Sequence, residues 1–85
     1  MKVYIPTPLR SYTKTSSVTA NGTTINELLN DLNDRFPGIK FRIINEQEEI
    51  REHIRIFINK DSTKDLNSSI NESDEIHILQ ALSGG

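Results

Sequence analysis

The chain has 85 residues, with 10 lysines and arginines against 12 aspartates and glutamates, for a net charge of -2. A single domain of this size is too small to enclose a deep active site, and its mixed charges leave no basic stripe for binding nucleic acid. The absence of cysteine excludes disulfides, thiolate metal sites and a catalytic thiol.

The beginning of the chain predicts two short strands joined by a loop. Residues 2–5 are rich in β-branched and aromatic side chains, and their alternation gives the strand one apolar face. The proline, serine and threonine residues that dominate residues 6–17 are typical of a loop, with Leu9 tucked beneath it. We expect a second strand over residues 17–20, followed by a turn.

A helix over residues 24–36 has the clearest local signal. Thr24 and Glu27 have the spacing of a capping box, in which the threonine side chain caps the helix and the glutamate reaches back to the cap. Pro37-Gly38 ends the pattern. The apolar residues recur at helical spacing and predict one buried stripe: Ile25, Leu28, Leu29, Leu32 and Phe36.

The second half of the chain predicts two further strands. Residues 39–44 favour a short helix or an irregular strand, and the acids of residues 46–49 favour an exposed loop. Residues 54–59 form a strand with three isoleucines inward, residues 60–62 a turn and residues 75–81 the closing strand. This order predicts an α+β fold, in which one helix covers one face of a mixed sheet.

The last four residues, Leu82-Ser83-Gly84-Gly85, place two glycines before the terminal carboxylate. Because glycine has no Cβ, such a tail is narrow and can enter a slot in a partner's active site. A frayed chain end is the alternative interpretation. We expect a single domain over residues 1–81 and a flexible tail over residues 82–85.

The titratable residues do not form a catalytic or metal-binding pattern. His53 and His77 lie far apart, with no second histidine or cysteine at ligand spacing, and are interpreted as ordinary strand or loop residues. We expect no bound metal or cofactor. Four acids are interpreted as turn residues rather than as paired catalytic carboxylates: Asp61, Asp65, Asp74 and Glu75. We expect Asp74 to organise a turn.

Four groups of residues occur in a specific order along the chain. They are Leu9-Arg10, Thr24-Ile25-Asn26-Glu27-Leu28-Leu29 with Leu32 and Phe36-Pro37-Gly38, Ile56-Phe57-Ile58-Asn59, and Glu72-Ser73-Asp74-Glu75-Ile76 leading to Gly84-Gly85. In this order they resemble the ubiquitin-like sulfur carriers of the ThiS/MoaD family, which are β-grasp proteins ending in Gly-Gly. The long segment between Pro37-Gly38 and Ile54 is most similar to the branch that serves cysteine biosynthesis.

The resemblance implies a β-grasp fold of four to five strands with one main helix on one sheet face. It also implies that the chain is a protein substrate and not an enzyme. A ubiquitin-activating-type adenylyltransferase would use ATP and magnesium to adenylate the Gly85 carboxylate, and a sulfur donor would convert it to a thiocarboxylate. Gly84 would keep the tail thin, while Leu82 and Ser83 would be gripped by the activating enzyme. A biosynthetic enzyme would then accept the sulfur.

Four acceptor pathways remain open for such a carrier: cysteine, molybdopterin, thiamine and transfer RNA thiolation. Three other functions are also open: a protein modifier conjugated through Gly85, the small subunit of a molybdopterin synthase, and a non-catalytic binding module. The start of the chain lacks the long apolar stretch of a signal peptide, and no apolar run approaches a membrane span. We therefore expect a cytoplasmic protein that is monomeric when free, with no membrane or nucleic-acid partner.

A second partner-binding surface is expected on the sheet. Strand alternation turns Tyr4, Phe57 and Leu79 away from the helix-facing core, and their strands are neighbours in a β-grasp sheet. A contiguous apolar patch on a bare sheet face is typical of a partner-binding surface. We expect these three residues to dock the activating enzyme.

Overall fold

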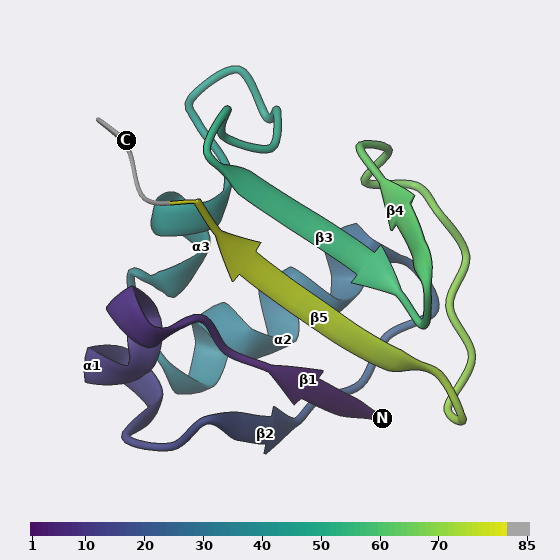
Figure 1. Ribbon diagram of the computed structural model, residues 1–85, viewed down its shortest axis with the longest axis horizontal. Helices are drawn as coiled ribbons and strands as arrows, with labels where there is room; N and C mark the ends of the chain where they lie inside the picture. The colour runs from purple at the N-terminus through teal and green to yellow at the C-terminus, as the bar shows by residue number, and fades with distance from the viewer. Residues whose placement is uncertain (82–85) are drawn as a thin grey trace.

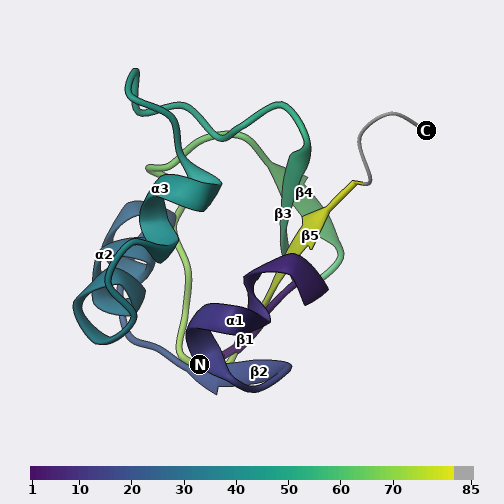
Figure 2. The same ribbon diagram turned by 90° about the vertical axis from the view of Figure 1, so that its left-hand side faces the viewer.

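The structure is a computed structural model that describes residues 1–81, and it places a five-stranded sheet against helices on one side (Figures 1 and 2). The strands are β1 (Lys2–Tyr4), β2 (Ser17–Thr19), β3 (Ile54–Ile58), β4 (Asp61–Thr63) and β5 (Glu75–Gln80). The α-helices are α1 (Arg10–Thr13), α2 (Ile25–Arg35) and α3 (Ile39–Ile43), and a 3-10 helix, η1, covers Thr7–Leu9. No helix within residues 1–81 is long and apolar enough to cross a membrane.

The strands follow the order β2-β1-β5-β3-β4 across the sheet. The central strand, β5, is parallel to β1, whereas β2 pairs with β1, β3 with β5 and β4 with β3 in antiparallel fashion. The first and last strands of the chain therefore lie side by side, and α2 packs across one face of the sheet (Figure 2). This is the predicted α+β, β-grasp arrangement.

Helix α2 begins at the predicted cap. The backbone N–H of Glu27 donates to the Thr24 Oγ1 at 3.2 Å, which satisfies one amide of the first helical turn. The Glu27 carboxylate does not return to the Thr24 N–H. It instead accepts from the Thr23 backbone N–H at 2.9 Å and the Thr23 hydroxyl at 2.8 Å. These two bonds stabilise the carboxylate anion and lower the pKa of Glu27, the backbone bond having the larger effect.

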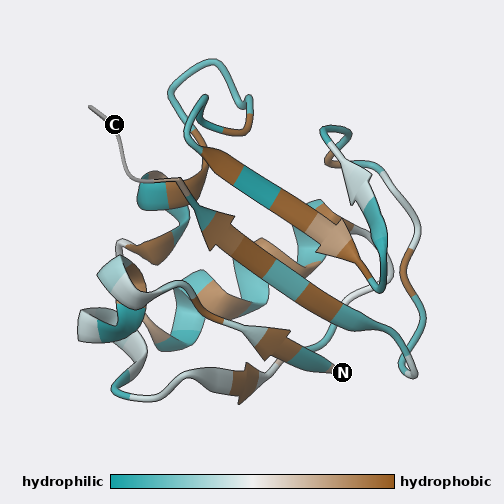
Figure 3. Ribbon diagram, viewed as in Figure 1, coloured by the Kyte–Doolittle hydropathy of each residue, from teal (hydrophilic) through white to brown (hydrophobic). Residues whose placement is uncertain are grey.

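The predicted helical stripe lies in the core. Four of its residues are fully buried and the last is partly buried against them: Ile25, Leu28, Leu29, Leu32 and Phe36. Along β3 and β5, buried isoleucines alternate with more exposed residues, so each strand turns an isoleucine face toward α2. Both strands carry hydrophobic residues along their length (Figure 3). The sequence pattern therefore identified the face that each of these elements buries.

The connection from α2 to α3 depends on Gly38. Its φ of +97° is a conformation that residues with a Cβ rarely adopt. The side-chain Oδ1 of Asn33 accepts from the backbone N–H of Gly38 at 3.1 Å and of Lys40 at 3.2 Å, which ties the new helix to the end of α2. Of the two structures expected for residues 39–44, the short helix is therefore the one that forms.

The expectation of a loop over residues 6–17 was wrong for its first half. Residues 7–13 form η1 and α1, with proline in the first turn of η1, where its fixed φ fits and no amide donor is needed. The Arg10 Nε donates to the Ile5 carbonyl at 3.0 Å, and Leu9 is buried, as expected. Composition alone indicated a loop because the buried contact that stabilises these helical turns is tertiary.

The turn expected over residues 60–62 was also wrong in part. The reversal occurs at Asn59 and Lys60, with Asn59 in the left-handed region at φ 56°, and Asp61 already begins β4. Ser62 pairs with Phe57 in the resulting antiparallel ladder. Strand β4 is short, polar and largely exposed at the edge of the sheet. Its composition therefore resembles that of a turn, which is why the sequence did not predict a strand here.

Candidate functional site

The part of the predicted site that the structure describes is the root of the tail. Strand β5 ends at Gln80, which pairs with Ile54 of β3. The backbone N–H of Ala81 then donates to the carbonyl of His53 at 2.8 Å, which ties the last described residue to the segment before β3. The predicted reacting and gripping residues follow this point and lie outside the described residues: Leu82, Ser83, Gly84 and Gly85.

The exposed sheet face contains the three predicted docking residues, but not as a continuous patch. Tyr4 of β1 and Phe57 of β3 both pair with His77 of β5, so the histidine lies between them. Tyr4 and Phe57 are half-buried, whereas Leu79, two residues further along β5, is 48% exposed. The sequence analysis treated His77 as an ordinary strand residue. Residues two positions apart in a strand point to the same face, so His77 and Leu79 both lie on this one.

Stacking and polar contacts fix the centre of this face. The rings of Tyr4 and His77 are stacked, with centroids 4.4 Å apart and an interplanar angle of 8°. The Tyr4 hydroxyl donates to one carboxylate oxygen of Glu75 at 3.4 Å, and the His77 Nε2 lies 3.9 Å from the other. The Lys2 Nζ lies 4.9 Å from the centroid of the Tyr4 ring. The face therefore combines aromatic area with both signs of charge.

A groove of about 720 Å³ connects this face to the tail root. The end of β5 forms one wall through Leu79 and Gln80, and the turn after β1, with Pro6 and Pro8, forms the other. Both prolines have restricted backbones, so this wall is stiff. The groove therefore places Tyr4 and Leu79 of the sheet face beside Gln80, the residue before Ala81.

The acidic residues before β5 have a structural role, as predicted for Asp74. Its Oδ2 accepts from the Asn71 backbone N–H at 2.8 Å and its Oδ1 from the Asn59 side chain at 2.9 Å. The pKa of Asp74 is lowered, first by the Asn71 bond and then by the Asn59 bond. Asn59 in turn accepts from the backbone N–H of Glu75 at 3.0 Å, so this network holds the β3–β4 turn against the start of β5.

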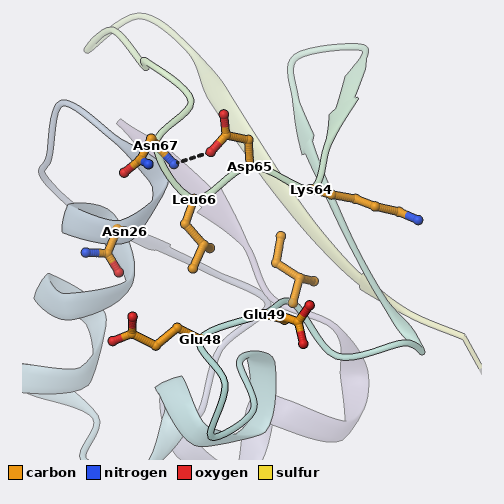
Figure 4. Close-up of a pocket in the computed structure, with 8 residues that line it drawn as sticks. Asn26, Glu48, Glu49, Lys64, Asp65, Leu66 and Asn67 are labelled. Atoms are coloured by element: carbon orange, nitrogen blue, oxygen red, sulfur yellow. Dashed lines mark hydrogen bonds between the residues drawn. The ribbon is translucent and has the colours of Figure 1, made fainter.

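A second hollow, of about 540 Å³, lies between the start of α2 and two loops (Figure 4). Glu48 and Glu49 line it from one loop and Lys64 and Asp65 from the other, although the Lys64 side chain extends away from the hollow and Asp65 points toward Asn67 (Figure 4). The Asp65 carboxylate accepts from the Asn67 backbone N–H at 2.9 Å, which is an ordinary turn contact (Figure 4). Among residues 1–81, no three histidine, cysteine or acidic side chains are grouped closely enough to hold a metal ion.

Comparison with known proteins assigns the chain to a family. The model of the ThiS family matches residues 3–85. The chain belongs to the ThiS family. It is 32% identical to the sulfur carrier protein CysO of Mycobacterium tuberculosis over 89 aligned positions, which cover 98% of this chain and 96% of that protein.

Two solved structures extend the comparison to the fold. In the crystal structure of the Amycolatopsis orientalis BexX/CysO complex, the matched chain has a TM-score of 0.90 and 34% identity, covering 99% of this chain and 98% of the other. The solution structure of small archaeal modifier protein 1 from Methanosarcina acetivorans has a TM-score of 0.82 and 29% identity, covering 99% and 94%. Both confirm the ubiquitin-like β-grasp fold.

Membership of the ThiS family confirms the central prediction from the sequence, that the chain is a sulfur carrier. It also confirms that the chain is a substrate of an activating enzyme rather than an enzyme itself, as the family's carriers are. The geometry of residues 1–81 fits this role, because the exposed sheet face and the groove lie next to Gln80 and Ala81, where the described part of the chain ends.

Proposed function

We propose that the Gly85 carboxylate is the reacting group of this ThiS-family carrier. A ubiquitin-activating-type adenylyltransferase would use ATP and magnesium to join that carboxylate to AMP, with release of pyrophosphate. A sulfide equivalent from a sulfur donor would then attack the acyl carbon, leaving a thiocarboxylate and releasing AMP. Adenylation is needed because a free carboxylate is a poor electrophile and AMP is a good leaving group.

The observation that carries this proposal is the continuation of the family match through Gly84 and Gly85. The bond from Ala81 to His53 fixes the chain four residues before Gly85. Two terminal glycines suit a narrow channel in a partner, because they have no side chains to obstruct it. Leu82 and Ser83 would supply the contacts that the activating enzyme grips.

The acceptor pathway that we propose is cysteine biosynthesis. Its support is the similarity to CysO over nearly the full length of both chains, together with the long segment between α2 and β3. The partners would be the activating enzyme, the sulfur donor and a sulfur-accepting biosynthetic enzyme. The complex of a CysO with BexX is an example of a relative bound to a protein partner. We propose that the carrier acts in the cytoplasm, where its activating enzyme has ATP, and is monomeric when free.

The test is the incubation of the full-length protein with the adenylyltransferase of its own host, ATP, magnesium and a sulfide donor. Intact mass should show the replacement of one oxygen by sulfur, and fragmentation should locate the change at Gly85. Two variants serve as controls, one lacking Gly85 and one with an alanine added after it. Both should keep the circular dichroism spectrum of the parent and remain unmodified. A full-length protein that gains neither AMP nor sulfur would refute the proposal.

A protein-modifier function is the second candidate, and the 29% identity to small archaeal modifier protein 1 favours it. In that function the acyl-adenylate would react with a lysine amine of a target in place of sulfide. Conjugates that resist reducing denaturation and disappear when Gly85 is removed would identify it. Their absence from host cells, alongside a recovered thiocarboxylate, would leave sulfur transfer as the function.

A further inference from the structure

A small groove of about 220 Å³ lies at the tail root, and its lining differs in character from that of the sheet face. Phe41 and Arg42 reach it from α3, Arg51 and His53 from the segment before β3, and Gln80 from the end of β5. We call these five residues the cationic groove. Gln80 also lines the larger groove beside Leu79, so the two grooves flank the same point of β5.

The cationic groove is tied to the domain by three hydrogen bonds. The Arg51 Nε donates to the Phe41 carbonyl at 2.8 Å, and the Arg51 backbone N–H donates to the Ile43 carbonyl at 2.9 Å. The third bond, from Ala81 to the His53 carbonyl, joins the same segment to the tail root. The groove and the tail root therefore keep a fixed relation, and a protein that holds one is positioned over the other.

The composition of the groove is that of a protein-binding surface. Phe41 is 63% exposed, the most exposed large apolar side chain within residues 1–81. Exposed aromatic residues beside arginines are enriched at the energetically important centres of interfaces. The described lining contains two arginines and no acid, although the chain carries a net charge of -2. Glu52, between Arg51 and His53 in sequence, is not part of that lining.

We propose that the cationic groove docks an acidic segment of the activating adenylyltransferase, with Phe41 entering an apolar pocket of that enzyme. This inference rests on the proposed function, because an enzyme that reacts with Gly85 must lie against the tail root. The carboxylates of the acidic segment would pair with Arg42 and Arg51. Opposite charges of this kind accelerate association and select the correct partner. This contact is separate from the one that Tyr4, Phe57 and Leu79 would make on the sheet face.

The test compares Arg42→Glu with Lys60→Glu. Both variants reverse one exposed positive charge, but Lys60 lies in the turn at the opposite end of β3 from the tail root. The rate of pyrophosphate release is measured with the host adenylyltransferase at low and high salt. Arg42→Glu should raise KM by roughly tenfold, with kcat unchanged, and weaken the salt dependence, because the lost contact belongs to docking. Lys60→Glu should change KM by less than about twofold.

Phe41→Ser separates the apolar contact from the charge. It should also raise KM by roughly tenfold without changing the unfolding midpoint, because a side chain that is 63% exposed contributes little to folding. Normal KM for both Arg42→Glu and Phe41→Ser, in a protein whose wild type is adenylated, would overturn the inference and leave the proposed function intact. A wild type that is not adenylated would overturn both.

Discussion

The Tyr4 ring lies flat against the His77 imidazole, although 73 positions separate the two residues in sequence (77 minus 4). The contact exists because β1 and β5 are parallel neighbours whose register pairs the two residues. It covers one side of each ring on a face that α2 does not protect. The stack therefore contributes to holding the first and last strands together while it forms the centre of the expected docking face.

A double-mutant cycle should detect this relationship. Tyr4→Ala and His77→Ala should each lower the free energy of unfolding, and the double variant should lose less than the sum. We expect a coupling of about 0.5 to 1 kcal/mol, as for stacked or cross-strand pairs. The measurement is urea denaturation at one pH. Additive losses would mean that the stack contributes nothing to stability.

Replacing Tyr4, Phe57 and Leu79 together by alanine should weaken docking of the activating enzyme more than it weakens folding. The reason is that Leu79 is 48% exposed and the other two are half-buried, so none belongs to the helix-facing core. Binding by calorimetry is compared with thermal unfolding of the same variant. A triple variant that binds and is adenylated normally would remove the sheet face as a partner surface.

Leu28→Ala should destabilise the protein by about 2 to 5 kcal/mol, because the side chain is fully buried beneath the sheet and its removal leaves a cavity. Leu79→Ala makes the same chemical change at an exposed position and should cost under about 1 kcal/mol. Chemical denaturation of both variants gives the comparison. Equal losses would contradict the assignment of the α2 stripe to the core.

Asp74→Asn should remove a pH-dependent part of the stability. Hydrogen bonds from Asn71 and Asn59 lower the pKa of Asp74 below its ordinary value of 3.8 in the folded protein. A depressed pKa stabilises the fold above the unfolded value, and this contribution disappears as the pH falls through the folded value. The stability difference between wild type and Asp74→Asn should therefore be constant near neutral pH and shrink below about pH 3.8.

Denaturation at a series of pH values checks this expectation. Asn59→Ala, which removes the smaller of the two causes, should reduce the pH dependence without abolishing it. A difference between wild type and Asp74→Asn that stays constant into the acid range would show that the carboxylate charge does not support the turn.

The sequence by itself determined the elements whose signals are local. The Thr24 cap, the apolar stripe and the Pro37-Gly38 stop predicted α2, because helical spacing and capping depend on residues within a few positions of each other. Alternation in β3 and β5 determined which side chains point toward α2 for the same reason. The Gly-Gly end and the order of the segments indicated the family before any geometry was known.

Only the tertiary structure decided which of these faces meet. His77 lies between Tyr4 and Phe57 because of the strand order, and strand pairing between distant segments leaves no local signal. The helical turns over residues 7–13 were missed because a buried Leu9 overrides a composition typical of loops. The cationic groove combines α3, the segment before β3 and the end of β5, which meet only when the sheet has formed.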